Sequence, residues 1–167
     1  SALALKLKDD SRISKLYFAK GTVTTAELGQ NVYDESVEGL RDFAIKERID
    51  LTIVGPEAPL VEGIVDEFKK HGLKIFGPEK RAAELEGSKA FSKKFMQTNN
   101  IKTAKAVVFD AYHDAIEYVR NQKFPIVIKA SGLAGGKGVV IADNLTEAES
   151  TIHKFMIERI YGDAGIQ

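Results

Sequence analysis

The same short pattern occurs twice in this chain, and it constrains the fold more than any other feature. Leu, any residue, Ile, an apolar residue and then Gly-Pro-Glu occupy residues 51–57 and again residues 73–79. Each copy predicts a short apolar strand that ends at a Gly-Pro turn. Between them, residues 58–71 carry apolar side chains at helical spacing, and Gly72 follows as an expected C-terminal cap. Two similar strands joined by one helix predict a right-handed βαβ unit with parallel strands.

The two Gly-Pro turns of such a unit lie at one edge of the parallel pair. This is the carboxyl edge of the strands, where open α/β sheets bind ligands. A Gly-Pro pair can also simply end a strand, which is the simpler interpretation for either turn taken alone. For Gly55, Pro56 and Glu57 both interpretations stay open, because a carboxylate follows the turn at the mouth of the strand.

The pattern of expected strands and helices changes near residues 86–89, which indicates a division of the chain there. Further strands are expected at 16–19, 105–109, 126–129 and 139–142, and helices at 2–8, 36–48, 79–100, 112–122 and 146–160, the last with a capping box from Thr146 to Glu149. Strands before the division alternate with helices, whereas the later ones flank a glycine-rich stretch. We therefore predict an α/β chain with a parallel-sheet domain over residues 1–87 and an α+β lobe over residues 88–167.

The densest chemical signal follows the strand expected at residues 126–129. Four glycines lie within seven residues, and a lysine lies among them; these are Gly132, Gly135, Gly136, Lys137 and Gly138. Glycines let backbone N–H groups turn toward a bound anion without Cβ clashes. Lys137 can add a positive charge to the same phosphate, and Lys129 on the incoming strand supplies a second cation.

Two familiar phosphate loops do not fit this stretch. A Walker A loop needs Ser or Thr after its Gly-Lys pair and then a helix, but here Gly138 and a β-branched strand follow. A dinucleotide-binding loop also needs a helix at this point. The pattern instead predicts a β-hairpin whose tip folds over phosphates, with an ordinary glycine-rich surface hairpin as the alternative.

A second basic segment lies at residues 88–96. Its expected buried stripe consists of Leu85, Phe91 and Phe95, and the lysines left outward are Lys89, Lys93 and Lys94. Taken alone, such lysines are typical of a solvated basic face.

Composition excludes several classes of function. Lys plus Arg and Asp plus Glu both total 24, so the net charge is zero, which argues against non-specific nucleic-acid binding. No apolar run approaches the roughly 20 residues that span a bilayer. The absence of cysteine removes disulfides and thiolate chemistry and fits a reducing cytoplasm. We expect a cytoplasmic protein that acts on small molecules, with neither nucleic acid nor a membrane as partner.

Four segments, taken in order, resemble the phosphoribosylamine–glycine ligases (glycinamide ribonucleotide synthetases) of the ATP-grasp superfamily. They are residues 51–60, 75–78, 85–91 and 127–139, and residues 161–165 are similar as well. The resemblance implies a parallel-sheet N-terminal domain followed by the first α+β lobe of an ATP-grasp domain. It also implies a reaction in which ATP, glycine and 5-phosphoribosylamine give glycinamide ribonucleotide, ADP and phosphate by way of a glycyl phosphate.

The resemblance also suggests roles for individual residues. Lys89 and Lys129 match two ATP-binding lysines, and Gly132, Gly135, Gly136, Lys137 and Gly138 match a mobile lid over the nucleotide. Gly55, Pro56 and Glu57 match a loop that borders the phosphoribosylamine site. The implied cofactors are ATP and Mg²⁺ or Mn²⁺, with the metal ligands beyond Gln167, and no catalytic residue is assigned.

The chain departs from the family in two ways. Lys20, Gly21 and Thr22 stand where the family has Pro-Gly-Asn, and the stretch from there to Glu38 is a few residues short. The family's first strand would precede Ser1, and its adenine-binding hinge would follow Gln167. We therefore expect a fragment of a longer ligase that is inactive alone.

Two alternatives remain. One is another ATP-grasp ligase or carboxylase of nucleotide metabolism, which the Gly-Pro-Glu-Ala-Pro-Leu string at residues 55–60 disfavours. The other is a non-catalytic ATP-binding module. Metal-binding Glu and Asn residues after position 167 would indicate a ligase, and their absence would indicate the module.

Overall fold

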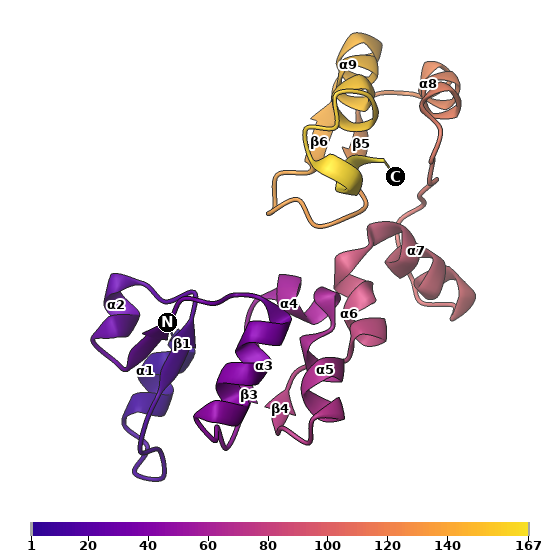
Figure 1. Cartoon of the computed structure of the whole chain (residues 1–167). Helices are drawn as coiled ribbons and strands as arrows, with labels where there is room; N and C mark the ends of the chain where they lie inside the picture. The colour runs from indigo at the N-terminus through magenta and orange to yellow at the C-terminus, as the bar shows by residue number, and fades with distance from the viewer. Residues whose placement is uncertain (1, 167) are drawn as a thin grey trace. The chain divides into compact units, whose positions relative to one another are not determined.

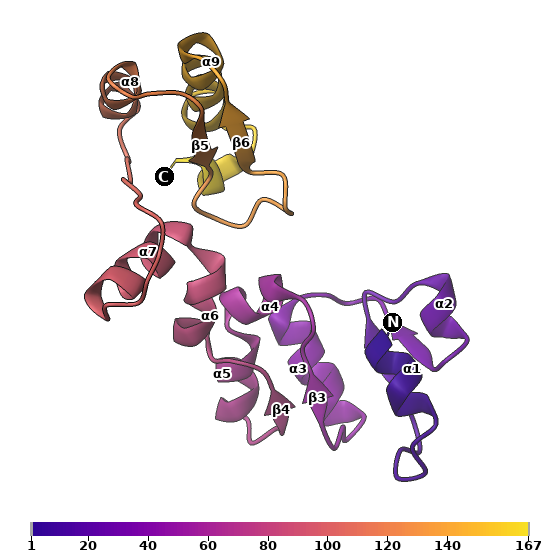
Figure 2. The same cartoon turned by 180° about the vertical axis from the view of Figure 1, so that it is seen from behind.

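A computed structural model describes residues 2–166 as two compact units (Figure 1; Figure 2 shows the reverse side). Residues 2–55 and 62–77 form unit 1, and residues 56–61 and 78–166 form unit 2. The helices are α1 (Ala2–Lys8), α2 (Val23–Ala26), α3 (Val37–Lys46), α4 (Glu57–Glu62), α5 (Ile64–Lys70), α6 (Lys80–Gly87), α7 (Lys89–Thr98), α8 (Tyr112–Arg120), α9 (Leu145–Met156) and the 3₁₀ turn η1 (Gly162–Gly165). The strands are β1 (Tyr17–Ala19), β2 (Gln30–Val32), β3 (Thr52–Ile53), β4 (Ile75–Phe76), β5 (Ile126–Lys129) and β6 (Val139–Ala142).

Unit 1 contains the predicted parallel pair built from the repeated motif. Strands β3 and β4 run parallel, with Thr52 opposite Ile75 and Ile53 opposite Phe76. Both Gly-Pro pairs therefore follow the carboxyl ends of adjacent strands, as the repeat predicted. A second parallel pair joins β1 to β2. Strand β2 could not be predicted, because Gln-Asn-Val has neither the alternation nor the apolar content of a typical strand.

The helix expected over residues 58–71 is in fact two helices. Gly63 has a φ of 101°, a left-handed conformation that ends α4 and starts α5. Most of the predicted apolar face is confirmed in α5, where Ile64, Val65 and Phe68 are buried. Gly72, with a φ of 70°, follows the end of α5 as the predicted cap, and the Leu73 N–H donates to the Phe68 carbonyl at 3.0 Å.

Unit 2 contains the predicted hairpin. Strands β5 and β6 are antiparallel, with Val127 opposite Ile141 and Lys129 opposite Val139. Helices α8 and α9 cover one face of the hairpin, and their shared core consists of Ala115, Ile116, Val119, Ala142, Ala148 and Ile152, with Ile126 and Ile128 against it. The architecture is thus a parallel α/β region followed by an antiparallel α+β region, which confirms the predicted fold class.

Three local predictions in unit 2 are wrong. The helix expected over residues 79–100 divides at Ser88, whose extended backbone (φ −135°) ends α6 and whose Oγ accepts the Phe91 N–H at 3.1 Å. Within the described part of the chain, residues 105–109 form no strand. The expected stripe beside α7 is not buried, since Leu85 and Phe95 are each 40% exposed.

The last long helix also begins and ends earlier than predicted. Asn144 is its N-cap, and the Asn144 side chain accepts the Glu147 N–H at 3.0 Å. Glu147 in turn accepts the Asp143 N–H at 3.0 Å. This reciprocal arrangement replaces the capping box expected at Thr146, because Asn is at least as good an N-cap as Thr.

No helix within residues 2–166 is long and apolar enough to cross a membrane.

Candidate functional site

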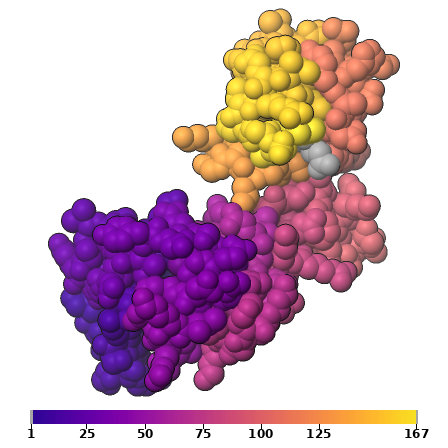
Figure 3. Space-filling view, viewed as in Figure 1, coloured from indigo at the N-terminus to yellow at the C-terminus, as the bar shows by residue number. Residues whose placement is uncertain are grey.

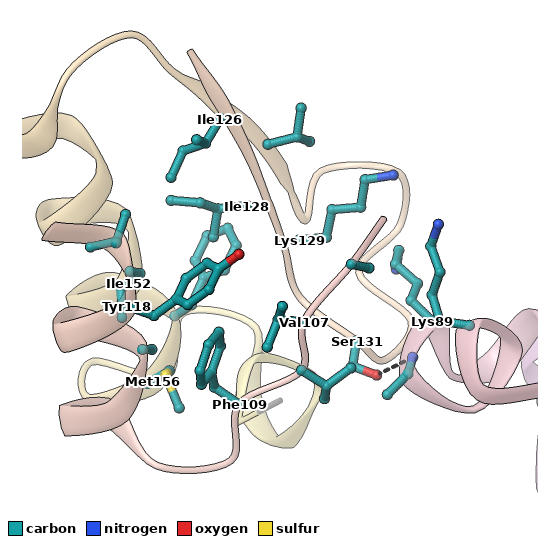
Figure 4. A pocket seen from close by; sticks show the side chains of 18 of the residues that line it. Lys89, Val107, Phe109, Tyr118, Ile126, Ile128, Lys129, Ser131, Ile152 and Met156 are labelled. Atoms are coloured by element: carbon teal, nitrogen blue, oxygen red, sulfur yellow. Dashed lines mark hydrogen bonds between the residues drawn. The ribbon is translucent and has the colours of Figure 1, made fainter. Parts of the chain in front are cut away.

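A cavity of about 500 Å³ opens in unit 2 beside the hairpin. Its apolar end is lined by side chains from α8, α9, β5 and the irregular segment 104–109, whereas Lys89, Lys129 and Ser131 lie at its other end (Figure 4). A mainly apolar hollow with a few polar groups at one end is typical of a small-molecule site.

Lys89 lies at the start of α7, where it contacts the beginning of the glycine-rich loop. Its Nζ donates a hydrogen bond to the Gly132 carbonyl at 3.1 Å, and its backbone N–H donates to the Ser131 carbonyl at 2.8 Å. The Ala90 N–H donates to Ser131 Oγ at 3.0 Å. Ser131 is 7% exposed, so this hydroxyl is a buried junction between the helix and the loop.

The glycine-rich loop, residues 132–138, connects β5 to β6 and projects from unit 2 (orange in Figure 3). Gly135 and Gly136 have φ values of 56° and 77°, which residues with a Cβ rarely adopt. The Lys137 N–H donates to the Ala134 carbonyl at 3.0 Å, which closes a turn at the tip. The Lys137 side chain is exposed there, and its contact with phosphate stays a prediction.

Lys129 lies at the end of β5 on the face of the hairpin opposite the core. Alternation along the strand directs Ile128 toward α8 and α9, so Val127 and Lys129 share the other face. This face is open, because Val127 is 56% exposed and Ile141 across from it is 65% exposed. Lys129 is therefore an exposed cation at the edge of an apolar strip, an arrangement that suits a ligand with a flat apolar part and an anionic part.

The other two lysines of α7 differ from each other. The Lys93 Nζ donates to Thr103 Oγ1 at 2.7 Å and to the Ala104 carbonyl at 2.9 Å. It thereby ties α7 to the segment that lines the cavity. Only Lys94 fits the solvated face expected for this cluster, and it is exposed.

The Gly55-Pro56-Glu57 turn has little around it. All three residues are exposed, and a Cβ built on Gly55 would meet no atom within 4 Å. Gly55 belongs to unit 1, whereas Glu57 opens α4. Their role in substrate binding stays a prediction.

The described residues do not fit a bound metal ion. Within residues 2–166, no three His, Asp or Glu side chains are grouped closely enough to hold one.

Comparison with known proteins now gives the family. Residues 1–86 match the family model for the phosphoribosylglycinamide synthetase N domain, and residues 87–167 match the model for the ATP-grasp (A) domain of the same synthetase. The chain belongs to the phosphoribosylglycinamide synthetase family. The resemblance noted in the sequence is thus confirmed over the whole chain.

Two curated relatives from different bacteria carry the same name. A phosphoribosylamine–glycine ligase of Clostridium acetobutylicum is 50% identical over 166 residues, which are 98% of this chain and 40% of that protein. The Escherichia coli K12 protein of the same name is 48% identical over 168 residues, covering 98% of this chain and 39% of its own length. The chain thus spans about 40% of the length of the curated relatives it matches.

Solved structures show the same fold. A phosphoribosylamine–glycine ligase of Thermotoga maritima superposes with a TM-score of 0.68 at 29% identity, covering 95% of this chain and 36% of that one. The biotin carboxylase domain of a Hydrogenobacter thermophilus 2-oxoglutarate carboxylase, solved with MgADP, superposes with a TM-score of 0.74 at 18% identity, covering 98% of this chain and 40% of that one. The second likeness concerns the fold alone, so it does not favour a carboxylase.

Two residues of this family member escaped the sequence reasoning. Ser131 lies at the start of the glycine-rich stretch, and nothing in the sequence indicates that its buried hydroxyl accepts a hydrogen bond from α7. Tyr161 lies within the segment that resembles the family, but its sequence position does not reveal that its hydroxyl donates to the Lys137 carbonyl at 2.7 Å. Such pairings join residues more than twenty positions apart, which periodicity cannot predict.

Proposed function

We propose that the protein carrying this chain is an ATP-dependent ligase that joins glycine to 5-phosphoribosylamine. In this proposal, the γ-phosphoryl group of ATP passes to the glycine carboxylate, which gives glycyl phosphate and ADP. The amine of phosphoribosylamine then attacks the glycyl carbonyl, and the C–O bond to phosphate breaks. The products are glycinamide ribonucleotide and inorganic phosphate.

One observation carries the proposal: Lys89 and Lys129 are among the residues that line the cavity of unit 2, and the glycine-rich loop begins three residues after Lys129. Lys89 also contacts this loop, since its Nζ donates to the Gly132 carbonyl at 3.1 Å. The transferred phosphoryl group gains negative charge that fixed cations and backbone N–H groups stabilise. In this proposal Lys89, Lys129 and Lys137 supply that charge, and Gly132, Gly135, Gly136 and Gly138 allow the backbone to approach the phosphoryl group.

Other parts of the proposal rest on family membership. Gly55, Pro56 and Glu57 would border the phosphoribosylamine site, and a divalent cation, Mg²⁺ or Mn²⁺, would accompany ATP. We place the boundary between the substrate domain and the ATP-grasp lobe near residues 86–89, where the two family models meet. The lack of cysteine is compatible with a cytoplasmic enzyme.

Nucleotide binding can be tested on this chain directly. Titration with MgATP, followed by the backbone amide signals in NMR, detects millimolar binding that calorimetry misses. We expect weak binding that shifts the signals of residues 129–138 and of Lys89, with ADP acting similarly and adenosine much less. An absence of shifts at millimolar ATP would contradict the assignment of this loop to phosphate.

The whole reaction needs a protein of full length. A chimera in which residues 1–167 replace the matching part of the Clostridium acetobutylicum ligase should form ADP only when both glycine and phosphoribosylamine are present. In that chimera, Lys129→Ala should raise the KM for ATP at least tenfold, because one lost charge contact to phosphate is worth about 1.5–3 kcal/mol. Lys94→Ala is the matched control on an exposed lysine, and equal KM values for the two variants would overturn the role of Lys129.

A further inference from the structure

A short segment of unit 2, residues 161–165, holds the end of the glycine-rich loop. The Tyr161 hydroxyl donates a hydrogen bond to the Lys137 carbonyl at 2.7 Å. The Tyr161 ring is itself fixed, since it lies edge-on against Phe155 with ring centroids 5.1 Å apart. Phe155 is 4% exposed on α9, so the tyrosine projects from a rigid part of the core.

The same segment also holds the beginning of the loop. The Gly132 N–H donates to the Ala164 carbonyl at 3.1 Å. The two residues touch so closely that a Cβ on Gly132 would lie 2.7 Å from the Ala164 Cβ. Gly165 is equally close to the Phe155 carbonyl, where a Cβ would lie at 2.6 Å. Residues 161–165 therefore bridge from the buried side of α9 to both ends of the loop.

We propose that residues 161–165 are a latch for the glycine-rich loop and that Tyr161 is the positioning residue within it. This inference rests on the proposed function, because it concerns how the loop meets the phosphates of ATP. The peptide between Lys137 and Gly138 is planar and trans, so its C=O and N–H point in opposite directions. When Tyr161 fixes the Lys137 carbonyl, it also fixes the direction of the Gly138 N–H, a donor that a phosphate oxygen can use.

The contribution of the Tyr161 hydroxyl can be measured separately from that of its ring. Tyr161→Phe keeps the edge-on contact with Phe155 and removes only the hydrogen bond to the loop. Tyr112→Phe is a matched control, because the Tyr112 ring also lies edge-on against a residue of α9, His153, with centroids 6.0 Å apart.

Amide hydrogen exchange on the nucleotide-free chain tests the latch itself. We expect Tyr161→Phe to speed exchange of the Lys137 amide, which donates to the Ala134 carbonyl, about fivefold, the effect of losing one net hydrogen bond. Exchange in α8 and β6 should stay the same, and Tyr112→Phe should leave the loop unchanged. Unaltered exchange of the loop in Tyr161→Phe would overturn the latch.

Titration with MgATP then separates this inference from the proposed function. If the native chain binds ATP, Tyr161→Phe should weaken ATP binding about fivefold and leave the response to adenosine unchanged, which a general loss of stability would not do. Equal ATP affinity for Tyr161→Phe and the native chain would overturn the latch and leave the proposed function intact. Failure of the native chain to bind ATP would overturn the phosphate assignment, while the exchange experiment would still decide whether the latch exists.

Discussion

The glycine-rich loop and the Gly55-Pro56-Glu57 turn look alike in the sequence but differ in the structure. Each combines glycine with a charged residue just after an apolar strand. The loop is held at its beginning by Ser131 and Lys89 and at its end by Tyr161. The turn is exposed, and nothing lies within 4 Å of the position of a Cβ on Gly55. A glycine motif can therefore serve the ligand, the fold or both, and only the tertiary contacts tell which.

The largest expected effect comes from adding a side chain to one glycine of each segment. Gly132→Val should lower the free energy of unfolding of unit 2 by about 3 kcal/mol, because overpacking costs typically 1–3 kcal/mol and here the backbone of Ala164 blocks the new atoms. Gly55→Val should change the free energy of unfolding of unit 1, to which Gly55 belongs, by less than about 0.5 kcal/mol, as expected at an open surface position. Urea unfolding followed by circular dichroism and by amide signals of each unit measures both. Similar losses for the two variants would mean that the contrast between the segments is false.

The next effect concerns the buried junction at the beginning of the loop. Ser131→Ala removes the acceptor of the half-buried Ala90 N–H and should lower the free energy of unfolding of unit 2 by about 1–2 kcal/mol, the penalty for a partly buried donor left without a partner. Ser150→Ala, on an exposed position of α9, is the control and should cost much less. Urea unfolding measures both variants. If Ser131→Ala lowers the free energy of unfolding as little as Ser150→Ala does, the loop does not depend on the Ser131 hydroxyl.

Low pH should lower the stability of unit 1 before that of unit 2. In unit 1, Arg41 donates to Glu67 Oε1 at 2.5 Å and to Asp42 at 2.8 Å. Hydrogen bonds from Arg41 hold the pKa of Glu67 and of Asp42 below their ordinary values. A lowered carboxyl pKa gives stability that is fully present above the ordinary value, near pH 4, and is lost as the pH falls through the lowered one. The hydrogen bonds at the ends of the loop join hydroxyl, amide and lysine groups and include no carboxylate.

We therefore expect amides of α3 and α5 to lose protection against hydrogen exchange as the pH falls from about 5 to about 3. Amides of β5 and β6 should lose protection only at lower pH. Both comparisons use exchange rates corrected for the intrinsic pH dependence of exchange. Arg41→Met should make the protection of unit 1 less dependent on pH in this window. Arg120→Met is the control, since Arg120 pairs with Glu149 at 2.7 Å in unit 2 and its side chain is 60% exposed. A simultaneous loss in both units, unaffected by Arg41→Met, would contradict the prediction.

The predictions from sequence succeeded where the signal is local. The repeat that ends in Gly-Pro-Glu gave the parallel pair β3 and β4, because two matching strands around one amphipathic helix leave few other topologies. The glycines between two β-branched segments predicted the hairpin, which is confirmed as β5 and β6. The β-branched residues after Gly138 excluded a Walker A loop, and a strand does follow Gly138. The same reasoning failed for residues 105–109, whose apolar residues line a cavity and form no strand, because periodicity does not say whether a partner strand is available.

The sequence by itself determined the family, the parallel pair β3 and β4 and the hairpin β5–β6, whereas the residues expected to bring charge to a phosphate stay a prediction. These features can be predicted because glycine, proline and the spacing of apolar residues determine the backbone conformation of segments only a few residues long. Only the tertiary structure decided that Lys93 ties α7 to residue 104, that Lys94 is free at the surface, and that Ser131 and Tyr161 fasten the loop. Those roles depend on which donors and acceptors the folded core brings within about 3 Å of each other. A hydrogen bond between residues far apart in the sequence cannot be predicted from the spacing of residue types.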